Sequence, residues 1–101
     1  MKQKYLTPVE IALLLDAFGG TLTEKQRVYA EMHYNEDLSY YEISDRVGIT
    51  ASGVCDIVTR ATAKLQKLES ATGFVHRLTE LREIAERLPD GDDKSALLER
   101  L

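Results

Sequence analysis

The chain has 101 residues, which is enough for one domain with a modest core and too few for two independent cores. Hydrophobic residues make up 44% and charged residues 30%, a balance that is ordinary for a globular protein and argues against global disorder. The formal net charge of −4 argues against a uniformly basic nucleic-acid binder, so any affinity for phosphate must come from a local patch.

The N-terminal stretch MKQKYLTPVEIALLLDAFGG has a basic tip followed by an apolar run, as a signal peptide does. Glu10 and Asp16 interrupt that run, and no stretch approaches the ~20 apolar residues of a membrane span. We therefore predict a helix here and no membrane association. Cys55 is the only cysteine, which allows no intrachain disulfide and suits the reducing cytoplasm. We expect a cytoplasmic protein.

Three segments have the pattern of a capping box, in which an N-cap hydroxyl precedes a Glu or Gln by three residues. They are Thr7-Pro8-Val9-Glu10, Thr23-Glu24-Lys25-Gln26 and Ser39-Tyr40-Tyr41-Glu42. The first predicted helix ends at Gly19-Gly20 and the second at about Tyr34. The third is short and ends at Gly48, a typical residue for the position after a helix.

The fourth predicted helix is the longest, capped by Thr50 and ended by Gly73. One apolar stripe follows it over four turns: Val54, Ile57, Val58, Ala61, Leu65 and Leu68. A fifth helix is predicted over about 74–88. A last short one, capped by Asp92 or Asp93, follows the break at 89–93. No segment alternates with a period of two, so the predicted fold is all-α.

Residues 39–68 have the pattern of a helix-turn-helix, in which two helices cross steeply through a tight turn. Gly48 is suited to the turn, and Ser44 is the small residue where the helices touch. The apolar residues predicted to lock the two helices to the core are Ile43, Val47, Val54 and Ile57, with Ile49 plugging the turn. An ordinary corner between two helices remains the alternative.

The start of the second helix in such a motif meets base edges. The outward candidates are Thr50, Ala51, Ser52, Cys55, Asp56, Thr59 and Arg60. Hydroxyls and free helix N–H groups suit phosphate or bases, whereas Asp56 repels phosphates although it suits a cytosine amino group. Small residues here equally suit close packing against a partner.

A cationic track continues along the same helix, where Arg60, Lys64 and Lys67 follow at i, i+4 and i+7. Such a track suits the phosphate backbone of DNA or of structured RNA. The alternative is a solvated face opposite the apolar stripe, as on most surface helices.

Leu22 to Glu69 resembles the YlxM-like family of small bacterial proteins, which are themselves similar to the region 4 helix-turn-helix of sigma factors. The segments that carry the resemblance are Leu22–Arg27, the turn from Tyr34 to Ser39, Gly48-Ile49-Thr50 and Val54–Ile57, with Phe18-Gly19-Gly20 before them. It covers about the first 70 residues. Residues 73–101 match only in being helical.

The resemblance implies a helical fold, a regulatory role, a link to the signal recognition particle pathway, and no catalytic activity or cofactor. Relatives often have Arg-Gln where Ser52-Gly53 stand, tyrosine at Cys55 and lysine at Thr59. This chain therefore lacks several side chains of the family that are suited to binding DNA.

The residues themselves show no catalytic or metal-binding pattern. His33 and His76 stand alone without a second ligand at metal-binding spacing, and there is no phosphate-binding glycine motif. We predict no enzyme activity, no metal and no cofactor. Two hypotheses remain for the function: a DNA-binding regulator, or an adaptor that uses the same module to bind a protein or ribonucleoprotein.

We divide the chain into a four-helix module at 1–72 and a C-terminal helical extension at 73–101. The extension carries more apolar side chains than the module can easily cover. The side chains predicted to form a dimer interface are Leu78, Leu81, Ile84, Leu88, Leu97 and Leu98, accompanied by Ala85 and Leu101. The hypothesis is a homodimer; folding back onto the module in cis is the alternative.

Overall fold

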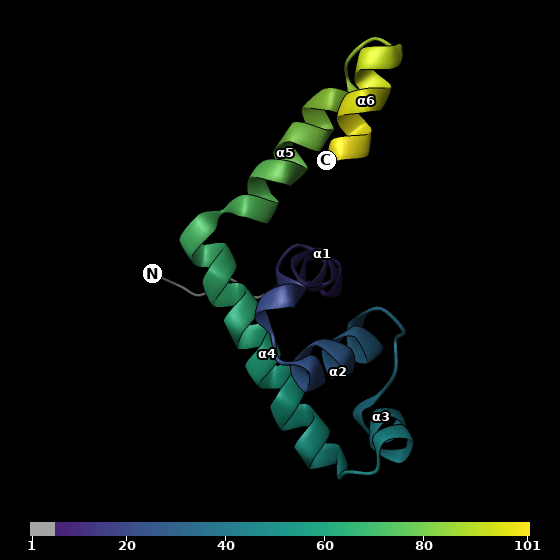
Figure 1. Ribbon diagram of the computed structural model, residues 1–101, viewed down its shortest axis with the longest axis vertical. Helices are drawn as coiled ribbons and strands as arrows, with labels where there is room; N and C mark the ends of the chain where they lie inside the picture. The colour runs from purple at the N-terminus through teal and green to yellow at the C-terminus, as the bar shows by residue number, and fades with distance from the viewer. Residues whose placement is uncertain (1–5) are drawn as a thin grey trace.

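The structure is a computed structural model that describes residues 6–101 (Figure 1). The described residues form α1 (Pro8–Phe18), the 3₁₀ turn η1 (Gly19–Thr21), α2 (Glu24–Tyr34), α3 (Tyr40–Val47), α4 (Ala51–Thr72), α5 (Phe74–Glu86) and α6 (Asp92–Arg100). They contain no strand, which confirms the all-α prediction. Residues 1–5, which include the predicted basic tip and the start of the predicted module, lie outside the described residues.

The helices begin and end where the capping residues predict. Full capping boxes form between Thr23 and Gln26 and between Ser39 and Glu42, and the Thr7 hydroxyl accepts a hydrogen bond from the N–H of Glu10. Gly48 and Gly73 end α3 and α4 in the left-handed conformation, with φ of 78° and 60°. Each of these punctuating residues satisfies backbone groups that a helix end leaves unpaired.

The last two helices differ from the prediction. The fifth helix ends at Glu86, two residues before the predicted Leu88. The cap of α6 is Gly91, which makes no side-chain hydrogen bond, and the prediction of Asp92 or Asp93 as the cap is wrong. Both aspartates lie inside the first turn of α6, where a carboxylate is stabilised by the positive end of the helix dipole.

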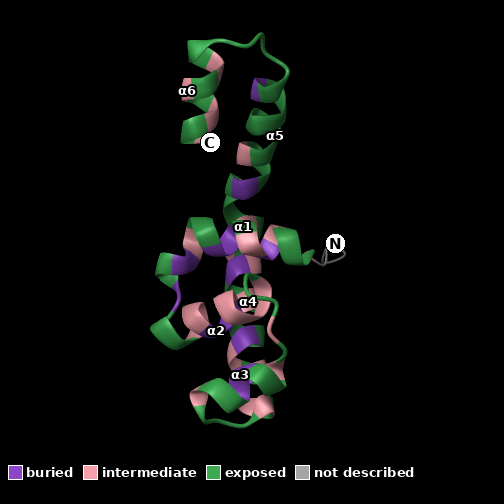
Figure 2. Cartoon of the chain, turned by 90° about the vertical axis from the view of Figure 1, so that its right-hand side faces the viewer, coloured by how far each residue is buried: buried purple, intermediate pink, exposed green. Residues whose placement is uncertain are grey.

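Helix α4 is the spine of the module, because its buried face contacts α1, α2, α3 and α5. At its C-terminal half it joins one core cluster: Ile11, Leu14, Leu15, Leu22, Ala30, Ala61, Leu65 and Val75. At its N-terminal half it joins a second: Tyr29, Ile43, Val54 and Val58. Figure 2 shows the buried residues concentrated along α4 and the helices around it. The second cluster holds α3 against the start of α4.

Helices α5 and α6 form an antiparallel hairpin that points away from the module (Figure 1). Only the start of α5 touches the module: Val75 is buried in the first cluster, and the rings of Phe74 and Phe18 lie 5.8 Å apart. The Cα radius of gyration is 16.2 Å, whereas a compact chain of this length has about 13 Å. The hairpin therefore does not fold back over the module.

A carboxylate fixes the elbow between α4 and α5. Glu69 on α4 accepts two backbone hydrogen bonds from the first turn of α5, from Val75 N and His76 N, both at 3.0 Å. Gly73, in the left-handed conformation, makes the bend. Gly73, at the N-cap of α5, has no side chain that could accept these hydrogen bonds. Glu69 accepts them instead and so takes the role of the N-cap side chain.

Candidate nucleic-acid interface

The bend at Gly48 forms the predicted helix-turn-helix between α3 and α4. The Gly48 N–H donates to the carbonyl of Ser44 at 2.9 Å, and Ile43 is fully buried behind the turn. Ser44 is buried, as expected for the small residue at the helix contact, and its hydroxyl donates to the carbonyl of Tyr41. Ile49, predicted to plug the turn, is 37% exposed, with its side chain close to Gly53 in the first turn of α4.

The first turn of α4 has free hydrogen-bond donors. The Thr50 hydroxyl accepts from Gly53 N at 3.0 Å, and the Thr50 carbonyl accepts from Val54 N at 3.0 Å. The N–H groups of Ala51 and Ser52 have no partner within the helix, as at the start of any α-helix. No acidic residue lies in this turn. The helix start is therefore suited to an anion such as phosphate.

Most of the predicted contact residues of α4 lie on its solvent face. The exposed ones are Thr50, Ser52, Asp56, Thr59, Arg60, Lys64 and Lys67. Ala51 and Cys55 are half-buried, and the Cys55 thiol lies 3.9 Å from the hydroxyl of Thr59. We name the exposed set together with these two residues the recognition face. The structure brings its members together on one helix.

The cations of the recognition face are less available than their spacing suggests. Arg60 forms an ion pair with Asp56, with its Nε 3.2 Å from Oδ2, and the Lys64 ammonium donates to the backbone carbonyl of Thr21. Lys67, further along α4, forms no ion pair with any described residue. Of these three cations, only Lys67 is free of an ion pair or carbonyl contact among the described residues. Arg60 and Lys64 must give up or share their present partners to bind phosphate.

The remaining cations of the module are also mostly paired with carboxylates. In the last turn of α3, Arg46 Nη1 lies 3.4 Å from Glu36 Oε1. On α2, Arg27 Nη1 lies 3.4 Å from Glu31 Oε1. Both pairs are substantially exposed, so each contributes little to stability and can open at little cost. Arg46 is thus able to join a phosphate contact near the turn.

An aromatic contact supports α3 from the side of α2. The His33 ring stacks on Tyr40 with centroids 4.4 Å apart, and His33 Nδ1 lies 2.8 Å from the carbonyl oxygen of Leu38. Burial raises the pKa of the Tyr40 phenol, and the neighbouring Tyr34 and Cys55 raise it further. The Tyr40 phenol therefore stays neutral and lies beside Cys55 of the recognition face without adding negative charge to that face.

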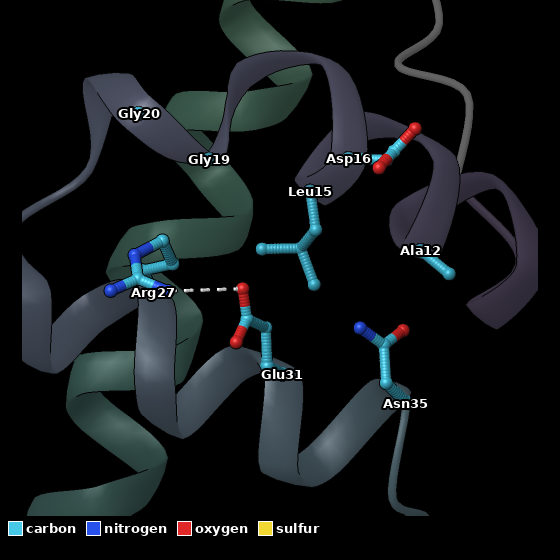
Figure 3. A pocket seen from close by; sticks show the side chains of 8 residues that line it. All are labelled: Ala12, Leu15, Asp16, Gly19, Gly20, Arg27, Glu31 and Asn35. Atoms are coloured by element: carbon cyan, nitrogen blue, oxygen red, sulfur yellow. Dashed lines mark hydrogen bonds and ion pairs between the residues drawn. The ribbon is translucent and has the colours of Figure 1, made fainter.

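A hollow of about 290 Å³ lies between α1, η1 and α2 (Figure 3). Its lining residues are Ala12, Leu15, Asp16, Gly19, Gly20, Arg27, Glu31 and Asn35. The Arg27–Glu31 ion pair closes one side of it. No member of the recognition face lines this hollow, and its one cation, Arg27, is already paired with Glu31, so no ligand is assigned to it.

Among the described residues, no group of three or more His, Cys, Asp or Glu side chains is placed to hold a metal ion. No helix among residues 6–101 is long and apolar enough to cross a membrane.

Two contributors to this site, the Thr21 carbonyl and Tyr40, were not predicted, and neither was the contact of Glu69 with the start of α5. The start of α5 at a glycine was a usable signal for Glu69, because the first N–H groups of a helix need an acceptor and Gly73 has no side chain. The Lys64–Thr21 contact joins residues 43 positions apart, and no local pattern indicates it.

Comparison with known proteins supports the same architecture. The model of the UPF0122 family, described as "Putative helix-turn-helix protein, YlxM / p13 like", matches residues 7–101. A UPF0122 protein of Symbiobacterium thermophilum is 39% identical over 90 residues, covering 85% of this chain and 84% of its own. One from Thermoanaerobacter sp. is 37% identical over 81 residues (80% and 69%), and one from Halalkalibacterium halodurans 32% over 88 (87% and 81%). No solved structure matches the chain.

Proposed function

The chain belongs to the UPF0122 family of YlxM/p13-like helix-turn-helix proteins, and we propose that it is a non-enzymatic, cytoplasmic regulator that binds duplex DNA through α4. The observation that carries this proposal is the bend at Gly48, which leaves the first turn of α4 exposed with two free N–H groups. A helix presented in this way enters the major groove in other helix-turn-helix proteins.

In the proposed complex the first turn of α4 lies in the groove and the cations further along the helix lie against the backbone. Ser52 and Thr59 point to solvent with hydroxyls that hydrogen-bond to bases or phosphate. Arg60, Lys64 and Lys67 supply the phosphate contacts after Arg60 leaves Asp56. Because no bidentate Arg, Asn or Gln stands in the first two turns, we expect affinity to depend on phosphate contacts more than on base identity.

The salt dependence of binding tests the proposal. Each phosphate contact adds about 0.9 to the slope of log affinity against log salt concentration, so Arg60→Ala with Lys64→Ala lowers that slope by about 1.8. Lys94→Ala with Arg100→Ala on α6 removes the same charge away from the recognition face and serves as the matched control. An equal fall in slope for both double variants contradicts the proposal.

The second candidate is an adaptor that docks a protein or ribonucleoprotein, such as a component of the signal recognition particle, on the same face. The observation that favours it is the small, weakly charged start of α4, in which Asp56 already neutralises Arg60. Under this proposal duplex binding is weak at physiological salt, because few phosphates are neutralised.

Ser52→Arg distinguishes the two candidates. Ser52 is exposed, so the larger side chain is accommodated without disturbing the core. A DNA binder gains a phosphate or guanine contact and binds duplex more tightly, with a steeper salt slope. An adaptor loses its partner because the close fit is blocked. The measurement is a titration with duplex DNA and with signal recognition particle RNA and protein at two salt concentrations.

A further inference from the structure

Helix α5 and the turn after it carry an apolar stripe that the other described residues leave about half exposed. Phe74, Leu81, Ile84 and Leu88 are 45%, 50%, 49% and 42% exposed. Phe74 and Leu81 are seven residues apart and Ile84 lies three after Leu81, so these three occupy a and d positions of a heptad repeat. Leu88 continues the same spacing just past the end of α5. A helix with this spacing buries its stripe against a second helix.

Helix α6 does not supply that second helix, because it packs on a different face of α5. Ala85 is fully buried and Leu78 half-buried in the hairpin, and Arg82 donates to the carbonyl of Leu101 at the end of α6. At about 100° per residue, Ala85, Leu78 and Arg82 lie about 40°, 60° and 100° around the axis from Leu81, on the other side of Leu81 from Ile84. The hairpin thus satisfies one face of α5 and leaves the a/d face open.

The module does not cover the stripe in cis either. The contact of α5 with α1 and α4 involves its first residues, and the rest of the hairpin stands clear of the module (Figures 1 and 2). Leu97 on α6 is another exposed apolar side chain of the same hairpin. The exposed area therefore belongs to the extension as a unit.

Two charges flank the stripe on the side away from α6. Glu80 and Arg87 both precede an a position, so both occupy g positions of the heptad. They are seven residues apart, about 10.5 Å along the helix axis, and are too distant to be neighbours on one helix. One carboxylate oxygen of Glu80 lies against His76 Nε2, and its second oxygen has no described partner in an ion pair.

We propose that the a/d face of α5 is the homodimer interface, on which a second copy of this chain docks its own α5 in the antiparallel direction. The twofold axis passes between the levels of Leu81 and Ile84, so that each Leu81 packs on the other protomer's Ile84. In this arrangement Glu80 of each protomer faces Arg87 of the other, which makes two identical ion pairs across a closed, isologous interface.

Charge complementarity selects this occupant and this direction. Antiparallel helices bring g positions together, and here they join Glu80 with Arg87 twice. Parallel helices pair g with e positions, which sets Glu80 opposite Ala85. The corresponding position for Arg87 is 92, which lies beyond the end of α5 in α6, so the parallel arrangement makes neither ion pair along α5. Arg77 at a d position limits the apolar seam to little more than one heptad. We therefore expect a reversible dimer with a micromolar dissociation constant.

Sedimentation from about 1 to about 200 μM tests the dimer, a range that spans micromolar dissociation constants. The wild-type full chain is expected to shift from monomer to dimer across this range, and Leu81→Glu to remain monomeric with unchanged helicity by circular dichroism. Leu81 is half exposed, so a charge there does not disturb the folded monomer. A strictly monomeric wild type at the highest concentration overturns the proposal.

The charge pair provides the test of register. Glu80→Arg places two arginines against each other at each site, and Arg87→Glu places two glutamates, so each variant alone dimerises at least tenfold more weakly than wild type. Mixed in equal amounts, the two variants restore opposite charges at both sites and form a heterodimer. A mixture that associates no better than its components overturns the antiparallel arrangement.

Discussion

Asp56 and Arg60 face each other one turn apart on α4, with 3.2 Å between the carboxylate and the guanidinium. Both side chains are more than half exposed, so the pair is worth a few tenths of a kcal/mol to the helix. Its importance is electrostatic: it neutralises the first arginine along α4 and sets a negative charge where phosphate must come.

Replacing Asp56 by Asn therefore increases affinity for duplex DNA. The change removes a repulsive charge and releases Arg60, which steepens the salt slope by up to about 0.9. Asp93→Asn on α6 makes the same change in net charge far from the recognition face and is the matched control. Fluorescence anisotropy against salt concentration measures both; equal affinities for the two variants would argue against contact at this turn.

Gly48→Ala destabilises the helix-turn-helix through backbone strain alone. The φ of 78° is unfavourable for a residue with a Cβ, at about 1–2 kcal/mol, and no heavy atom lies within 4 Å of the added methyl group. Gly20→Ala also meets no atom within 4 Å but carries no positive φ, so it is expected to be nearly neutral. Urea unfolding of both variants checks the difference, which should vanish if the turn is not strained.

The burial of Leu65 and of Leu81 distinguishes the core of the module from the exposed stripe of α5. Leu65 is fully buried in the first cluster, so Leu65→Ala costs about 2–5 kcal/mol of unfolding free energy. Leu81→Ala, at 50% exposure, changes it by about 0.5 kcal/mol when the protein is dilute and monomeric. Denaturant unfolding at low protein concentration gives both values, and similar losses would mean that α5 is buried in cis.

Glu69→Ala loosens the elbow between α4 and α5. It leaves Val75 N and His76 N without their acceptor, which costs about 1 kcal/mol, as does loss of a helix cap. Glu69→Gln keeps one carbonyl oxygen and is expected to lose less. Thermal unfolding gives the stability, and small-angle scattering shows whether the hairpin changes direction. No change in either for Glu69→Ala would contradict the capping role.

The capping box of α3 makes the free energy of unfolding depend on pH. Hydrogen bonds from the backbone N–H of Ser39, and then from its hydroxyl, hold the pKa of Glu42 below its ordinary value of 4.5. Stability from the carboxylate is therefore present above pH 4.5 and lost as the pH falls through the folded-state pKa. Glu42→Gln keeps an acceptor at every pH and is expected to flatten the melting-temperature profile below this pH. A profile parallel to wild type would contradict this role.

Local signals predicted the helices well because their caps are local chemistry. Thr23, Ser39 and Thr50 each bond to a backbone N–H three residues on, and the two left-handed glycines end helices where expected. The wrong prediction at α6 has the same origin: Gly91, without a side chain, caps the helix, and the two aspartates lie one and two residues after the cap.

The candidate site was harder to predict because availability depends on tertiary contacts. Spacing places Arg60 and Lys64 on one side of α4, but it does not show that Thr21, from the turn before α2, accepts from Lys64. Cys55 was expected to point outward and is half-buried because α3 brings Tyr40 beside it. Periodicity alone likewise did not show which elements cover the leucines of α5. An apolar stripe indicates that a helix face is buried, but it does not show against what.

Amide chemical shifts of the labelled full chain during titration with duplex DNA test the central proposal most directly. We predict that the largest changes fall on Ala51, Ser52 and Gly53 in the first turn of α4 and extend to Arg60 and Lys64, while the amides of α6 stay unchanged. Changes confined to the α5–α6 hairpin, or no change at low salt, would contradict a DNA interface on this helix.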